Sequence, residues 1–181
     1  EIWNGGMSFH GGFLGVVFAG LLFCYLNSLN VLAVGDLLAL ATPPGLFLGR
    51  LANFANAELW GAPTKLPWGV VFPGVRAQDC PDVAGICARH PTQIYEALLE
   101  GLILFLILNT IIFHQKYKIG TCSYLFLIFY GFLRIFSEFF REPDPQIGYF
   151  FNLFSMGTLL SLFMVLIGFI LFVILRKKNE T

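Results

Sequence analysis

The chain has 181 residues, of which 57% are apolar and only 12% are charged, and its mean hydropathy is +0.75. Soluble domains carry roughly 25% charged residues, so this composition excludes an ordinary soluble protein and indicates an integral membrane protein. Eleven basic residues balance eleven acidic ones, and the formal net charge of zero gives no overall attraction to nucleic acid. We therefore expect no nucleic-acid partner. Binding of any other ligand must depend on local groups of polar or charged residues.

Five apolar segments are long enough to cross a bilayer, which takes about 20 helical residues. They run over residues 11–28, 35–56, 92–113, 120–140 and 149–175. The second segment contains Thr42, Pro43 and Pro44, which predicts a kink or a break in its helix. The sequence thus predicts an all-α polytopic membrane helix bundle that forms a single domain over residues 1–181.

Basic residues next to the predicted spans indicate how the chain is oriented. Lys116 and Lys118 follow the third span, and a basic run at 176–178 lies close to the C-terminus. Because basic loops stay on the cytoplasmic side, we expect both points there. With five spans, the loop over residues 57–91 and the turn over 141–148 then face outward.

Two cysteines lie close together in the predicted outer loop. Cys80 and Cys87 bound the segment CPDVAGIC. An oxidising compartment would allow them to pair, and a free pair fits the sequence equally well. The chain has no His/Cys/Asp cluster at metal-ligand spacing, so we expect neither a metal nor another cofactor.

The second span ends in the polar segment GRLANFANAELWG, residues 49–61. In a helix, Arg50 and Asn53 share a face, with Glu58 about two turns beyond Arg50. An isolated arginine here would simply extend to the interface beside Trp60. Two asparagines and a glutamate accompany Arg50, which favours a site.

The fourth span contains YGFLRIFSEFFREPD, in which Tyr130, Arg134 and Glu138 recur every four residues. They therefore line one stripe of a helix. An ion pair between Arg134 and Glu138 would make two buried charges tolerable without any function. A charge inside a span costs about 2.5–3.5 kcal/mol on insertion scales, and a purely structural pair gives no reason for that cost. We favour a functional interpretation.

Two further segments supply polar residues. HPTQIYEALLEG opens the third span and places Gln93, Glu96 and Glu100 on one face, where we expect them to support the site. GGMSFHGGFLG surrounds His10 with glycines, and a histidine with a pKa of about 6.5 suits a general base. The alternative for His10 is a flexible interfacial loop; His90 is a weaker candidate.

Arg50 and Arg134 are expected near the outer ends of two different spans. Two converging guanidinium groups suit phosphate, and the nearest phosphates in a membrane belong to lipid head groups. Two alternatives stay open. The first is a small transporter, which would need a polar path to the cytoplasm, whereas the inner halves of the spans are apolar apart from Asp36. The second is a structural or non-catalytic lipid-binding subunit, in which the ion pairs would only fix how the helices align.

The segments GGMSFHGG, GRLANFANAELWG, HPTQIYEALLEG and YGFLRIFSEFFREPDPQIG, in this order, resemble the characteristic segments of the bacterial phosphatidylglycerol:prolipoprotein diacylglyceryl transferase family. Ala55 and Ala57 stand where family members usually have a larger aliphatic residue and a glycine. The family has seven spans and this chain about five, and it opens on Glu1 without an initiator methionine. We therefore expect a fragment of a longer protein.

The resemblance implies a reaction at the outer leaflet of the bacterial inner membrane. The diacylglyceryl group of phosphatidylglycerol is transferred to the lipobox cysteine thiol of a prolipoprotein, which forms a thioether and releases glycerol phosphate. Arg50 and Arg134 would bind the lipid phosphate and stabilise the leaving group, and His10 would be the candidate base for the thiol.

The resemblance also implies five residues that hold the substrates: Asn53, Glu58, Gly61, Tyr130 and Glu138. The first three would orient Arg50 and the lipid glycerol, and the last two would act around Arg134. The expected partners are phosphatidylglycerol, the lipobox peptide and membrane lipid. From its position, the loop over residues 62–90 is expected to cover part of the site or to receive the peptide.

Overall fold

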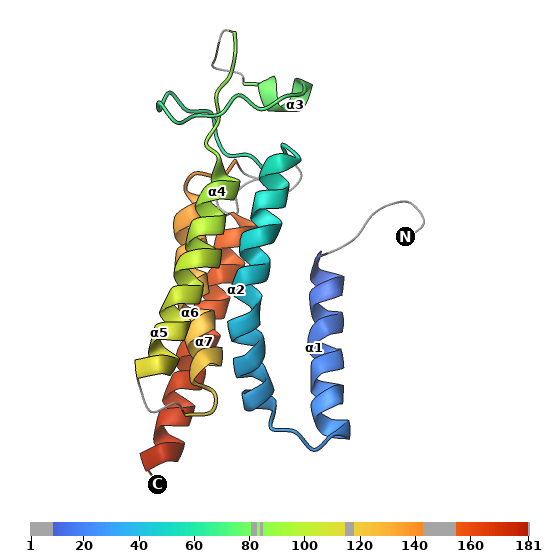
Figure 1. The fold of residues 1–181 in the computed structure, drawn as a ribbon, viewed down its shortest axis with the longest axis vertical. Helices are drawn as coiled ribbons and strands as arrows, with labels where there is room; N and C mark the ends of the chain where they lie inside the picture. The colour runs from blue at the N-terminus through green and yellow to red at the C-terminus, as the bar shows by residue number, and fades with distance from the viewer. Residues whose placement is uncertain (1–8, 81–82, 84, 115–117, 143–154, 181) are drawn as a thin grey trace.

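The computed structural model describes residues 9–80, 83, 85–114, 118–142 and 155–180, and helices dominate this part of the chain (Figure 1). The helices are α1 (Phe9–Leu26), α2 (Val31–Ala55), α3 (Val75–Gln78), α4 (Thr92–Glu96), η2 (Ala97–Ile103), α5 (Leu104–His114), α6 (Thr121–Glu138) and α7 (Met156–Glu180). α2, the continuous run α4–η2–α5, α6 and α7 form a bundle, and α1 stands to one side of it (Figure 1). The predicted all-α bundle is confirmed.

Several of these helices suit a membrane. Among the described residues, three helical segments are long and apolar enough to cross a bilayer: Val31–Ala55, Thr92–Phe113 and Met156–Lys177. The apolar part of α1, Leu14–Leu26, is shorter. α6 is not one of these three segments, and it carries Arg134 and Glu138 in its C-terminal half. The protein is therefore a multi-pass membrane protein, and each predicted span contains a helix, although residues 149–154 of the last lie outside the described part.

Of the kink or break predicted at the two prolines of α2, the break does not occur. The helix runs from Val31 to Ala55 with Pro43 and Pro44 inside it. A proline has no N–H to donate to the preceding turn, so a helix that contains one is held by its surroundings. Here α2 packs against both η2 and α6, and Pro43 itself is buried.

The third span contains a π-helix, η2, and it lies close to α2 at Gly101 within this π-helix. A Cβ on Gly101 would lie 2.6 Å from the Cβ and 2.8 Å from the Cα of Phe47. Only a residue without a side chain permits this approach. Short π-helical segments occur frequently at functional sites, and η2 carries Glu100 next to this contact.

Asp36 in α2 caps the N-terminus of α6. Its Oδ2 accepts from the Gly120 N–H at 2.6 Å, and its Oδ1 accepts from the N–H and the hydroxyl of Ser123 at 2.7 and 2.8 Å. The first N–H groups of a helix have no partner within the helix, and a carboxylate satisfies them well. The main polar exception in the inner halves of the spans thus has a structural role.

We expect Asp36→Ala to lower the free energy of unfolding by about 3 kcal/mol, because buried donors lose a charged acceptor. Thermal unfolding in detergent micelles measures this change. Asp36→Asn keeps the volume and one acceptor oxygen, so its loss should be smaller. An Asp36→Ala protein that unfolds at the same temperature as the parent would show that the cap contributes no stability.

Candidate active site

Six charged side chains meet where the helix bundle joins the loop over residues 57–91, which we call the outer loop after its predicted position. We call them the ion-pair cluster: Arg50, Glu96, Glu100, Arg134, Glu138 and Arg141. They come from α2, from the α4–η2 segment, and from α6 with the residues that follow it. The cluster therefore depends on three segments that are far apart in the sequence.

Arg50 and Arg134 share the same two carboxylates. Arg134 Nη1 lies 2.5 Å from Glu96 Oε1 and 3.3 Å from Glu100 Oε1. Arg50 Nε lies 2.9 Å from Glu96 Oε2, and its Nη2 lies 3.9 Å from Glu100 Oε2. The structure thus brings the two arginines together, with Glu96 bridging them.

Two other charged residues complete the cluster. Arg134 Nη2 lies 3.0 Å from Glu138 Oε2, one turn along α6, as the spacing predicts. Arg141 Nη1 lies 3.4 Å from Glu96 Oε1. The Ser155 hydroxyl, directly before α7, donates to Glu138 Oε1 at 2.8 Å, so α7 also helps to fix the cluster.

Burial divides the cluster into an inner and an outer layer. The side chains of Glu96 and Glu100 are completely buried, whereas those of Arg50, Arg134 and Arg141 are 17%, 12% and 14% exposed. A buried carboxylate is costly unless it is paired, and here each lies between guanidinium groups. The carboxylates hold the arginines in place, and the arginines form the accessible layer that an anionic ligand meets first.

The segment after α2 differs from the expected continuous helix. α2 ends at Ala55, and Ala57 has a positive φ of 54°, so Glu58 does not lie two turns along the helix from Arg50. The side chain of Glu58 is exposed and accepts from Asn56 Nδ2 at 3.4 Å. Its carbonyl accepts from Gln93 Nε2 at 2.6 Å. Glu58 is therefore held through its backbone, outside the cluster's ion pairs.

Asn53 and Tyr130 lie on the helices that carry the cluster. Asn53 is half-buried on α2, one turn beyond Arg50, and its carbonyl accepts from the Glu58 N–H at 3.0 Å. Tyr130 is half-buried on α6, one turn before Arg134, and stacks on Phe126 with ring centroids 5.5 Å apart. Each of these side chains therefore lies one helical turn from an arginine of the cluster.

Gly61 is a backbone junction between the outer loop and the end of α6. Its N–H donates to the carbonyl of His90 at 2.9 Å, and it forms an isolated antiparallel bridge with Arg141. A Cβ on Gly61 would overlap the carbonyl oxygen of Phe140 and would lie 2.5 Å from Thr92 Cγ2. Any side chain here would push these segments apart.

The two candidate histidines have different positions. His10 lies in the first turn of α1, and its side chain lies outside the described part of the chain. His90 Nδ1 lies 3.2 Å from the Tyr95 hydroxyl, which accepts from Trp68 Nε1 at 2.8 Å. Burial lowers the pKa of His90, which favours the neutral ring, and Tyr95 is then placed to donate to it.

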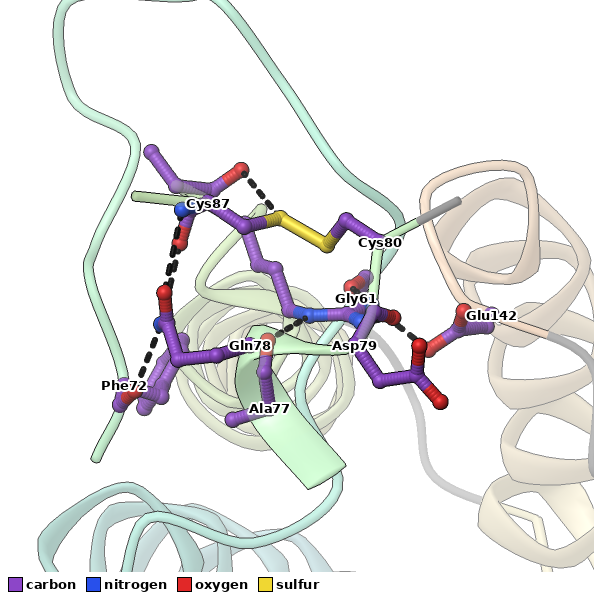
Figure 2. Close-up of a disulfide and its surroundings, with 10 residues drawn as sticks. Gly61, Phe72, Ala77, Gln78, Asp79, Cys80, Cys87 and Glu142 are labelled. Atoms are coloured by element: carbon purple, nitrogen blue, oxygen red, sulfur yellow. Dashed lines mark hydrogen bonds and ion pairs between the residues drawn. A yellow bond between two sulfur atoms is a disulfide. The ribbon is translucent and has the colours of Figure 1, made fainter. Parts of the chain in front are cut away.

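The outer loop contains the disulfide Cys80–Cys87, with a Cα–Cα distance of 6.4 Å (Figure 2). The pairing left open by the sequence is therefore present. Cys24 and Cys122 are free and buried. Among the described residues, no three His, Cys, Asp or Glu side chains are arranged to hold a metal ion.

Sequence reasoning underestimated several residues. Glu96 and Glu100 were predicted only to support the site, yet they form the centre of the cluster. Neither Arg89 nor Arg141 is among the residues predicted from the sequence. The sequence contained a positional signal for both, because Arg89 directly precedes the segment HPTQIYEALLEG and Arg141 lies within the segment YGFLRIFSEFFREPD.

Comparison with known proteins identifies the family. Residues 1–174 match the family model described as prolipoprotein diacylglyceryl transferase. This chain belongs to that family. A Cereibacter sphaeroides member named phosphatidylglycerol–prolipoprotein diacylglyceryl transferase is 52% identical over 192 residues, which cover 99% of this chain and 65% of the relative.

Other relatives carry the same name. The Rhodospirillum rubrum protein is 50% identical over 98% of this chain and 63% of its own length, and the Roseobacter denitrificans protein is 49% identical over 92% and 61%. The chain therefore spans slightly less than two thirds of the curated relatives it matches. The family segments include both shared arginines and both buried glutamates of the cluster.

Proposed function

We propose that the ion-pair cluster binds the phosphate of phosphatidylglycerol, and that the protein transfers the diacylglyceryl group of this lipid to the lipobox cysteine of a prolipoprotein. The observation that carries the proposal is the convergence of Arg50 and Arg134 on Glu96 and Glu100. Planar guanidinium groups with several N–H donors match phosphate oxygens in charge and geometry. The relatives' names supply the reaction.

The proposed reaction is a displacement at carbon. The thiolate of the lipobox cysteine attacks the glycerol carbon that carries the phosphate ester, a C–S bond forms and the C–O bond breaks. Glycerol phosphate leaves with the electron pair of that bond. Preorganised charge at the leaving group lowers the barrier, and Arg50 and Arg134 supply it.

The thiol must lose its proton, because the thiolate is the nucleophile and a free thiol has a pKa of about 8.5. His10 is the proposed base, on the strength of its family segment. Glu96 and Glu100 keep the arginines aimed without reacting themselves. Asn53 and Tyr130 are proposed to contact the lipid, Glu138 to orient Arg134, and Glu58 and Gly61 to contribute through their backbone.

We further propose that the cluster faces the outer leaflet of the bacterial inner membrane. The outer loop and the cluster lie at one end of the bundle, and the C-terminal end of α7 lies at the other (Figure 1). Basic residues at 176–178 favour the cytoplasm for that end. The disulfide supports an oxidising compartment for the loop.

The test is thioether formation on a lipobox peptide in phosphatidylglycerol vesicles, measured as a mass gain of one diacylglyceryl group. We would assay the chain as given and a chimera in which it replaces the matching segment of the Cereibacter sphaeroides relative. Phosphatidylcholine vesicles serve as the control lipid. We expect transfer by the chimera from phosphatidylglycerol only.

Two outcomes would count against the proposal. A folded chimera that gives no mass gain would indicate a non-catalytic lipid-binding or transport role. Equal transfer from both lipids would show that the head group is not recognised. Activity of the chain as given would show that these residues alone suffice for the reaction.

A further inference from the structure

Arg89 is a buried guanidinium group outside the ion-pair cluster, with only 1% of its side chain exposed. Its Nε donates to the carbonyl of Ala77 at 2.6 Å, its Nη2 to that of Asp79 at 2.9 Å and its Nη1 to that of Gly61 at 3.3 Å. Nη1 also lies 2.6 Å from Glu142 Oε2 (Figure 2). One side chain therefore joins three separate segments.

The disulfide loop fixes two of these carbonyls. Cys80–Cys87 ties the residues that follow α3 to the residues that precede Arg89 (Figure 2). The Gln78 amide strengthens this connection, because its Nε2 donates to the carbonyls of Phe72 and Cys87 at 2.9 and 3.2 Å while its Oε1 accepts from the Cys87 N–H at 3.0 Å. The carbonyls on either side of Gln78 are thereby held towards Arg89.

The other two partners of Arg89 lead to the ion-pair cluster. Glu142 follows Arg141 in the chain, and Gly61 forms its backbone bridge with Arg141. The N–H of Ala62 donates to the carbonyl of Phe140 at 3.0 Å, so the same short segment is held at two points. Arg141 in turn reaches Glu96 in the cluster.

We infer that Arg89 is a positioning residue, which sets the place of Arg141 in the proposed phosphate site by joining the disulfide loop to the segment after α6. The inference rests on the proposed function. A buried guanidinium needs all its acceptors, so the segments cannot drift apart without leaving a buried charge unsatisfied. The bundle does not depend on this contact, because its helices pack against one another through Gly101 and Gly131.

A double-mutant cycle tests the inference with the chimera described above. Arg89→Gln, Arg141→Gln and the double variant are compared by kcat/KM for the lipobox peptide. We expect each single change to lower kcat/KM at least tenfold and the double variant to match Arg141→Gln within about twofold, because residues that act through one another are not additive. A merely structural role would not make the effect of Arg89→Gln vanish in the Arg141→Gln background.

Three further variants sharpen the comparison. Arg76→Gln removes an exposed arginine from the same outer loop and should retain full activity. Arg89→Lys keeps the charge but loses the planar fork, so it should remain impaired. The Cys80→Ser, Cys87→Ser double substitution should lower kcat/KM in the Arg141 background and not in the Arg141→Gln background.

The outcomes separate this inference from the proposed function. An inactive but folded parent chimera would reject the proposed function and this inference with it. An active parent combined with an unchanged Arg89→Gln variant, or with losses that multiply in the double variant, would overturn the inference alone. If Arg89→Gln does not fold, Glu142→Gln decides by the same cycle, because Glu142 is 41% exposed and the change removes only its charge.

Discussion

Arg134→Lys is expected to lower transfer by about a hundredfold while the protein still folds. Two nitrogens of the Arg134 guanidinium contact Glu96, Glu100 and Glu138 at the same time. A lysine ammonium is a single point charge on a flexible stem, so it cannot hold all three carboxylates and also face a phosphate. The measurement is kcat/KM for the lipobox peptide in phosphatidylglycerol vesicles, with the thermal unfolding midpoint recorded in parallel.

The matched control for this change is Arg76→Lys, which alters an exposed arginine of the outer loop in the same way. It should leave activity unchanged. Arg134→Ala is expected to cost about 3–5 kcal/mol of stability as well, since it removes one partner from buried carboxylates. Near-normal transfer by Arg134→Lys would show that Arg134 serves only as an ion-pair partner and would remove it from the phosphate site.

Gly61→Ala is expected to lower the free energy of unfolding by about 3 kcal/mol and to reduce transfer more than tenfold. The new methyl group would overlap the carbonyl oxygen of Phe140 and would lie 2.9 Å from His90 Cβ. Backbone cannot move aside as the end of a flexible side chain does, so the outer loop and the segment after α6 must separate. Thermal unfolding and the transfer assay measure the two effects.

Gly45→Ala is the control for Gly61→Ala. Gly45 lies inside α2, and a Cβ there would meet nothing within 4 Å. Alanine is favoured over glycine in a helix by about 1 kcal/mol, so this variant should be as stable as the parent or more stable. If Gly61→Ala unfolds at the parent's temperature and retains its activity, the close junction at Gly61 contributes to neither property.

The two predictions probe different parts of one arrangement. The Arg134→Lys variant tests whether the cluster binds an anionic group. The Gly61→Ala variant tests whether the outer loop must lie close to the end of α6. If both hold, the outer loop is part of the machinery that positions the site. It would then be more than a cover over the helices.

The sequence alone determined the class of the protein and the periodic features of its helices. Apolar runs long enough for a bilayer predict helices because every backbone polar group must be satisfied within its own segment. The spacing of Arg134 and Glu138 likewise predicts their ion pair, since residues four apart meet on a helix. Both features depend only on residues within one segment of the chain. The expected reaction came from the resemblance of four segments to a known family.

Only the tertiary structure decided which side chains share a site. Glu96 meets Arg50 and Arg134 because η2 lies close against α2 at Gly101 and because α6 packs beside both. Such contacts depend on how three helices pack, and no periodicity within one segment encodes their relative height or rotation. The burial of Arg89 between Gly61 and Glu142 was settled in the same way, by contacts between segments distant in the sequence. The pairing of Cys80 with Cys87 also became known only from the structure, although these two cysteines are close in the sequence.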